Sequence, residues 1–221
     1  PAVQGVDASV AAQTILQKAS AAMANQQASA AVKDVSMKGK VSVMGQSIDV
    51  EQVNIIPGAY SFTVSMGGMQ LQKQQLKDGK YLQSAQGQNV EMDAKAKEEL
   101  DERAAFFSDA YLLQQKGNEY KVSGIEKVEG KDAYVLQVKT EGGREFTNFY
   151  DVASGLKVKS TQMQDAGPMG QVNVQSYYYD YKPFNGVQIP TRIVIDMGQM
   201  KQELTFSEIK INSGLKPADI K

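Results

Sequence analysis

The chain contains no histidine, no cysteine and no tryptophan among its 221 residues. Zinc sites in proteins depend mainly on histidine and cysteine ligands. Ser-His-Asp and Cys-His catalysis also require residues that are missing here. We therefore predict no catalytic residue, no metal site and no cofactor for this chain, and expect its function to rest on binding or on structure.

Clustered positive charge is missing as well. Lysine and arginine total 24 against 25 acidic residues, which gives a net charge of −1, and the only arginines are Arg103, Arg144 and Arg192. Proteins that bind nucleic acid neutralise its phosphates with basic patches. The composition therefore predicts no nucleic-acid partner.

Long apolar runs are also absent. No segment approaches the roughly 20 apolar residues of a membrane-spanning helix, so we predict no transmembrane segment.

The lack of cysteine suits both a reducing cytosol and a bacterial envelope protein built without disulfides. The chain begins with Pro1 rather than methionine, which leaves open an upstream signal peptide or further domains.

What the chain has in abundance is alternation of apolar and polar residues, the pattern of half-buried strands. The clearest stretch places Tyr60, Phe62, Val64 and Met66 on one side. Gly-Gly and Asp-Gly pairs separate several of these stretches and are typical of tight hairpin turns. In the last strand the apolar positions change parity, which predicts a bulge near Ser207.

Two segments break this alternation with helical patterns. We predict a helix over residues 7–24, capped by Asp7. In the second segment, residues 93–115, we predict one helix from Asp93, its cap, to about residue 107 and a third, short helix over about residues 108–115. The second helical segment carries a dense run of charges over residues 95–103. Because lysines lie one turn from its carboxylates, we expect this run to be a solvent-exposed face rather than an acid–base pair.

These patterns together predict a mainly β fold with covering helices. We expect one large, curved antiparallel sheet of about eleven to thirteen strands, an unclosed β-barrel with both helical segments against its concave side. The expected organisation is a linker at residues 1–6, a half-barrel domain at residues 7–211 and a C-terminal tail at residues 212–221.

Apolar residues of the concave face form the candidate binding site. Several are methionines, whose flexible and polarizable side chains suit a surface that accepts variable apolar ligands. The alternative is that these methionines fill an ordinary core. We predict that the face binds a lipid acyl chain or a similar apolar group through Met37, Val41, Phe62, Val64, Met66, Leu136, Val174, Ile193 and Ile195.

A cluster of tyrosines lies in one predicted strand, at Tyr177, Tyr178, Tyr179 and Tyr181. Stacking on bases or sugars is one interpretation of such a cluster. Because no basic groove accompanies it, cross-strand aromatic packing is the interpretation that we favour.

The order of helix, meander, paired helices and second meander resembles the lipoprotein-carrier fold of LolA and LolB. The chain resembles still more the region that follows the catalytic repeats in Bacteroidetes zinc peptidases of the pitrilysin (insulinase) type. The shared stretches span most of the chain from about residue 8 to residue 211. They are residues 35–39 (VSMKG), 65–69 (SMGGM), 124–134 (GIEKVEGKDAY), 150–159 (YDVASGLKVK) and 185–190 (NGVQIP).

This resemblance implies an unclosed barrel with helices over an apolar concave face, and it implies two roles. One is a non-catalytic module of the bacterial envelope, in the periplasm or at the outer membrane, that holds an acyl chain of a lipid or lipoprotein. The alternative is an accessory C-terminal domain of a zinc peptidase, with the upstream peptidase domains as partners.

Two departures qualify the resemblance. The zinc motif of those peptidases needs two histidines, so any peptidase activity would belong to domains outside this chain. LolA holds its helical lid with an arginine on an early strand, and residues 47–55 contain no arginine.

Overall fold

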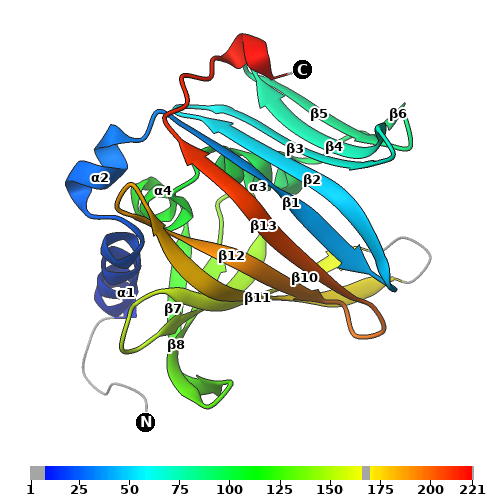
Figure 1. Cartoon of the computed structure of the whole chain (residues 1–221). Helices are drawn as coiled ribbons and strands as arrows, with labels where there is room; N and C mark the ends of the chain where they lie inside the picture. The colour runs from blue at the N-terminus through cyan, green and yellow to red at the C-terminus, as the bar shows by residue number, and fades with distance from the viewer. Residues whose placement is uncertain (1–7, 166–169, 221) are drawn as a thin grey trace.

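The computed structural model describes residues 8–165 and 170–220. Its strands form one 13-stranded antiparallel sheet in the order β6-β5-β4-β3-β2-β1-β13-β12-β11-β10-β9-β8-β7. The sheet curves around the helices, and its edge strands β6 and β7 do not pair with each other in the described part of the chain (Figure 1). The predicted fold class, a mainly β unclosed barrel with covering helices, is confirmed.

The first meander consists of β1 (Asp34–Val43), β2 (Gln46–Ile55), β3 (Ala59–Met66), β4 (Met69–Lys77), β5 (Lys80–Ala85) and β6 (Gln88–Asn89). The second consists of β7 (Glu119–Val128), β8 (Lys131–Lys139), β9 (Glu145–Asp151), β10 (Lys157–Asp165), β11 (Gln171–Phe184), β12 (Val187–Asp196) and β13 (Lys201–Ile211). The helices are α1 (Ala8–Met23), α2 (Gln26–Ala31), α3 (Ala94–Ala104) and α4 (Ser108–Gln114), followed near the C-terminus by a short 3-10 helix (Pro217–Asp219).

The path of the chain brings the helices onto one face of the sheet. Strands β6 and β7 lie at opposite edges, so the connection that carries α3 and α4 must cross the sheet between them. Helix α3 packs on β3 and β4, while α1 packs on α4 and β7 (Figure 1). We call the side that these helices cover the concave face and the other side the outer face.

A bulge joins the two meanders at the β1–β13 pair. Lys38 lies opposite Glu208 but Gly39 lies opposite Phe206, so Ser207 is the extra residue. A Cβ atom added to Gly39 would lie 2.0 Å from the carbonyl oxygen of Thr205, which explains why glycine occupies this position. The bulge predicted near Ser207 is confirmed.

The helix boundaries follow from capping groups. The carboxylate of Asp93 accepts a hydrogen bond from the amide of Ala96 at 2.7 Å, which confirms the predicted cap of α3. After α1, the side chain of Asn25 accepts one from the amide of Ala28 at 2.8 Å and starts α2, a helix that the sequence pattern did not predict. The predicted linker at residues 1–6 and the predicted cap Asp7 lie outside the described residues.

The segment after β13 is held against the sheet. The buried carboxylate of Asp34 accepts hydrogen bonds from the amides of Ser213 and Gly214 at 2.8 and 3.0 Å. Ile220 is buried against Ile55 and Ala59, whose side chains point to the outer face. The C-terminal residues thus cover part of the first meander from outside.

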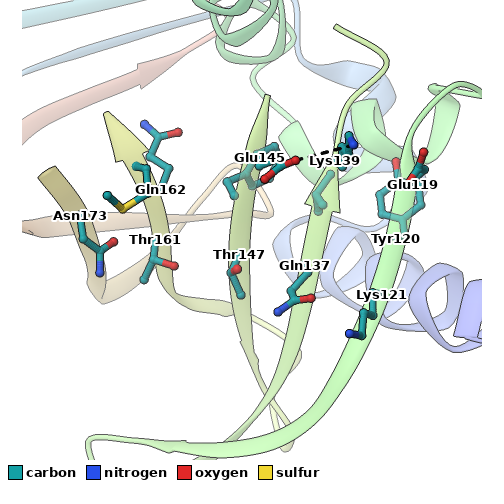
Figure 2. Close-up of a pocket in the computed structure, with 13 residues that line it drawn as sticks. Glu119, Tyr120, Lys121, Gln137, Lys139, Glu145, Thr147, Thr161, Gln162 and Asn173 are labelled. Carbon is teal, nitrogen blue, oxygen red and sulfur yellow. Dashed lines mark ion pairs between the residues drawn. The ribbon is translucent and has the colours of Figure 1, made fainter. Parts of the chain in front are cut away.

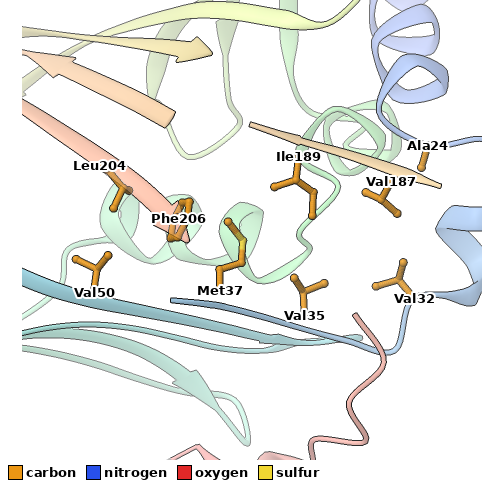
Figure 3. Close-up of a cluster of buried hydrophobic side chains, with 9 residues drawn as sticks. All are labelled: Ala24, Val32, Val35, Met37, Val50, Val187, Ile189, Leu204 and Phe206. Carbon is orange, nitrogen blue, oxygen red and sulfur yellow. The ribbon is translucent and has the colours of Figure 1, made fainter. Parts of the chain in front are cut away.

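The largest set of buried apolar side chains joins the two meanders on the concave face (Figure 3). It takes residues from β1, β2, β12 and β13, together with two residues from the segment around α2. Its members are Ala24, Val32, Val35, Met37, Val50, Val187, Ile189, Leu204 and Phe206. A second cluster lies beneath α1 and α4, and a third lies beneath α3.

Candidate functional site

The strand register places the predicted ligand-binding residues on one side of the sheet. Val41 lies opposite Leu204, which lies opposite Ile193. Phe62 and Met37 both lie opposite Gln52, one on each side of it. Because directly opposed residues share a face, these residues belong to one concave surface that runs across both meanders.

The predicted residues differ in how far they are covered. Met37 is 4% exposed, Leu136 0% and Val174 7%, so these three are core residues in this conformation. Five others, Val41, Phe62, Val64, Ile193 and Ile195, are half-buried. Met66 is 44% exposed and lies at the end of β3.

The structure brings part of this set together. Val41, Phe62, Val64 and Ile193 pack against the cluster that contains Met37. Leu136 belongs instead to the cluster beneath α1 and α4. We call Met37, Val41, Phe62, Val64 and Ile193 the concave apolar patch. Met37 is buried within it, and the other four side chains are only half-buried.

The connection between α3 and α4 reaches this patch with two aromatic side chains. Phe106 and Phe107 both pack against the same cluster, with their ring centroids 5.1 Å apart and their planes at 83°. Phe106 has a φ angle of +63°, a left-handed conformation that costs about 1–2 kcal/mol for a residue with a side chain. The surrounding contacts must offset this cost, and such strain is characteristic of functional segments.

Helix α3 is fastened to the concave side by polar groups. The amide group of Asn54, which is fully buried on β2, donates to the carbonyl oxygens of Arg103 and Ala104 at 2.7 and 3.4 Å. Arg103 pairs with Glu99 at 2.6 Å and hydrogen-bonds the hydroxyl of Tyr60 on β3. An arginine therefore links helix and sheet here too, but it lies on the helix and not on an early strand.

This arrangement sets the ionisation states of Glu99 and Tyr60. Burial by itself raises the pKa of the Glu99 carboxyl, but the neighbouring Arg103 guanidinium and further contacts with Arg144 and Gln162 outweigh it, so the pKa lies below its usual range. Burial raises the pKa of the Tyr60 hydroxyl despite the nearby Arg103. At neutral pH the pair is thus an ionised carboxylate and guanidinium beside a neutral phenol.

The prediction that the charged residues of α3 form a solvent-exposed face is wrong in part. Glu102 forms an ion pair with Arg144, and both side chains are largely buried. Glu98 accepts a hydrogen bond from the hydroxyl of Thr140 at 2.5 Å. These carboxylates join α3 to the β8–β9 turn, a contact between segments too far apart in sequence for the local charge pattern to reveal.

Helix α4 is fastened by a second buried polar group. Asp109 accepts a hydrogen bond from the hydroxyl of Tyr150 at 2.6 Å and pairs with Lys157 at 3.1 Å. Burial, reinforced by the Asp109 carboxylate, raises the pKa of Tyr150 well above its ordinary value. Burial alone would lower the pKa of Lys157, but Asp109 raises it. The lysine stays protonated, which suits an anchor and not a nucleophile.

Two hollows of about 510 Å³ and 310 Å³ lie outside the concave apolar patch, toward the outer face of the second meander.

Among residues 8–165 and 170–220, no group of three or more acidic side chains is arranged to hold a metal ion. No helix within those same ranges is long and apolar enough to cross a membrane.

No protein-family model and no curated protein sequence matches the chain. The chain does match several solved structures. A DUF1329 family protein from Desulfovibrio piger superposes with a TM-score of 0.68 at 9% identity, covering 98% of each chain. A LolA superfamily protein from Nitrosomonas europaea gives a TM-score of 0.61 at 14% identity, over 95% of this chain and 97% of the other.

A third similar structure is a domain from Vibrio parahaemolyticus described as an outer membrane lipoprotein-sorting protein. It gives a TM-score of 0.65 at 13% identity, over 94% of this chain and 96% of the other. At such identities the likeness concerns the fold, and the coverage shows that it extends over nearly the whole chain. The chain therefore has the unclosed-barrel fold of LolA-like proteins.

Proposed function

We propose that this chain is a non-catalytic binding module that holds a lipid acyl chain or a similar apolar group between its curved sheet and its helices. The observation that carries the proposal is the concave apolar patch. Val41, Phe62, Val64 and Ile193 are only half-buried, although they face the side on which a core would bury them completely. An apolar ligand would complete their burial.

The energetics favour a moderate affinity. Each methylene group taken out of water contributes roughly 0.8 kcal/mol, so ten of them would contribute about 8 kcal/mol. Association and side-chain ordering remove a large part of this. A dissociation constant in the micromolar to millimolar range follows.

In this proposal Phe106 and Phe107 occupy the place of the ligand. They pack against the patch from a connection between two helices, and Phe106 does so in a strained conformation. An incoming acyl chain would replace apolar contacts with apolar contacts and release that strain. Helices α3 and α4 would keep their polar anchors, so only the connection between them has to move.

Location and partner are part of the proposal. The proteins of similar fold include one described as an outer membrane lipoprotein-sorting domain, which supports a place in the bacterial cell envelope, in the periplasm or at the outer membrane. The proposed partner is the acyl chain of a lipid or of a lipoprotein. The alternative is an accessory domain of a zinc peptidase, a role that does not require the chain to bind a lipid.

The experiment is a titration with cis-parinaric acid, a fatty acid whose fluorescence rises in an apolar site. The wild-type chain should bind it, and Phe62→Glu should not, because the substitution puts a charge at the centre of the patch. Thr63→Glu is the matched control, since the next residue of β3 points to the outer face, and it should bind as the wild type does.

The stability of Phe62→Glu separates the two roles. In a ligand site that solvent reaches, the variant stays folded. If instead the wild type does not bind the fatty acid and Phe62→Glu loses several kcal/mol of stability, the patch is an ordinary core. That outcome would leave only the accessory role.

A further inference from the structure

The outer face of the second meander carries a row of uncharged polar side chains. Gln137 on β8 lies opposite Thr147 on β9, which lies opposite Thr161 on β10. Figure 2 shows these side chains on successive strands, with Asn173 of β11 beyond them. They line a hollow of about 510 Å³, a size within the range of about 300–1,000 Å³ of small-molecule sites.

These groups are available to a ligand. The side chains of Gln137, Thr147, Thr161 and Asn173 make no hydrogen bond to another protein group in the described part of the chain. Together they offer amide and hydroxyl groups that both donate and accept. A ligand with many hydroxyl groups would find partners along the whole row.

Aromatic rings adjoin this row. Lys159 precedes Thr161 by two residues on β10, and so shares its face; it lines a second hollow of about 310 Å³ with Phe149, Tyr177 and Tyr179. The two tyrosine rings lie 6.4 Å apart with their planes at 15°. Two of the four tyrosines that the sequence singled out, Tyr177 and Tyr179, therefore flank a hollow.

Charges around both hollows balance. The first has Glu119 and Glu145 against Lys121 and Lys139, with Lys139 and Glu145 paired at 3.8 Å. The second is lined by three carboxylates and three lysines, namely Glu126, Glu129 and Asp196 with Lys127, Lys159 and Lys201. A strongly anionic or cationic ligand gains little net electrostatic attraction from such a surface, and an uncharged polar ligand does not need any.

We propose that these adjoining hollows form a binding site for a neutral oligosaccharide on the outer face, separate from the concave apolar patch. Sugar hydroxyls would pair with the row of Gln137, Thr147, Thr161 and Asn173, and the apolar side of a sugar ring would pack near the tyrosines. An extended peptide fits the row itself less well, because the backbone groups of strands β8 to β11 already pair with one another. Strand β7, which also lines both hollows, is an edge strand, so a peptide added to that edge is the competing outcome of the test.

The test is a titration of the ¹⁵N-labelled chain with tetra-N-acetylchitotetraose and, separately, with maltotetraose, followed by amide chemical shifts. At least one saccharide should shift amides of β8 to β11 around the row. Thr147→Val combined with Thr161→Val removes both hydroxyls while keeping the side-chain shape, and should weaken binding by about tenfold or more. Thr147→Ser combined with Thr161→Ser should retain binding.

Thr63→Val is the matched control, a threonine of the outer face in the first meander, and it should leave binding unchanged. The proposal is overturned if neither saccharide shifts these amides, or if the valine double variant binds as the wild type does. Saturable shifts of the same amides by an unstructured peptide, with none by either saccharide, would assign the surface to peptides instead. A fatty-acid titration reports on the opposite face, so the two proposals fail independently.

Discussion

At the scale of single residues, the side-chain amide of Asn54 ties strand β2 to the end of α3. Asn54 donates to the carbonyl oxygens of Arg103 and Ala104 at the end of the helix and accepts a hydrogen bond from Gln52 at 2.8 Å. Carbonyl groups at a helix C-terminus lack partners within the helix. A fully buried asparagine on the sheet supplies one, and thereby fixes where α3 ends.

The Glu99 carboxyl makes stability depend on acid. Because its pKa is lowered in the folded chain, its contribution is complete above the ordinary pKa of glutamate and is lost as the pH falls through the folded pKa. We therefore expect Glu99→Gln to flatten the fall in melting temperature between about pH 5 and pH 3. Thermal unfolding at a series of pH values measures this.

Glu91→Gln is the control for that series, because Glu91 is exposed and forms no ion pair in the described part of the chain. It should reproduce the acid profile of the wild type. A Glu99→Gln profile parallel to that of the wild type would show that the Arg103 contact does not carry the acid dependence.

At the scale of elements, strands were more predictable than the groups that hold helices on the sheet. Period-two alternation and Asp-Gly or Gly-Gly turns are local, and so are the parity change at Ser207 and the cap at Asp93; the structure confirms all of them. Helix α2 was missed because the Asn25 cap follows directly on the end of α1, where the pattern indicated only a stop.

The β1–β13 bulge yields a prediction at the same scale. Gly39→Ala places a methyl group against the backbone of Thr205, which cannot move without breaking the pairing of the two meanders. We expect a loss of about 1–3 kcal/mol or more in the free energy of unfolding, measured by urea denaturation.

Gly117→Ala serves as its control. There the three nearest atoms to the added methyl group all belong to the side chain of Glu141, at 2.4 to 2.9 Å. That side chain has to shift, but the backbone pairing of the two meanders is not involved, so the loss should be smaller than at Gly39. Equal effects of the two substitutions would contradict the assignment of Gly39 to a backbone contact.

The connection between α3 and α4 yields a further prediction. Phe106→Gly removes the aromatic ring that packs against the concave apolar patch, and glycine adopts a positive φ angle without strain. If Phe106 competes with the ligand, the variant should bind cis-parinaric acid more tightly than the wild type, because less of the population is blocked. Phe106→Leu keeps both bulk and strain and should bind nearly as the wild type does; weaker binding by Phe106→Gly would show that the ring supports the site.

At the scale of the whole molecule, the decisive feature is that β6 and β7 lie at opposite edges of one sheet. The chain must cross the concave face between them, and it does so with α3 and α4. The alternating pattern could predict which residues face inward, and hence the concave apolar patch. It could not predict that Leu136 lies under α1 and α4 while Phe62 stays half-buried, since coverage depends on where distant helices dock.

The same limit applies to the contacts that fasten those helices. Asp109 meets Tyr150 and Lys157, and Glu102 meets Arg144, across separations of about forty residues or more that no local pattern connects. Opposite strands could be aligned from turn positions, but the docking of a helix on a curved sheet depends on tertiary packing.

The absence of tryptophan from the chain allows the central claim to be measured with a single reporter. Phe62→Trp places the only indole at the concave apolar patch, and Tyr179→Trp places it on the outer face. Titration with a dibrominated stearic acid, which quenches indole fluorescence on contact, should quench Phe62→Trp saturably and leave Tyr179→Trp nearly unchanged. Quenching of neither reporter, or of both alike, would contradict a ligand site between the sheet and its helices.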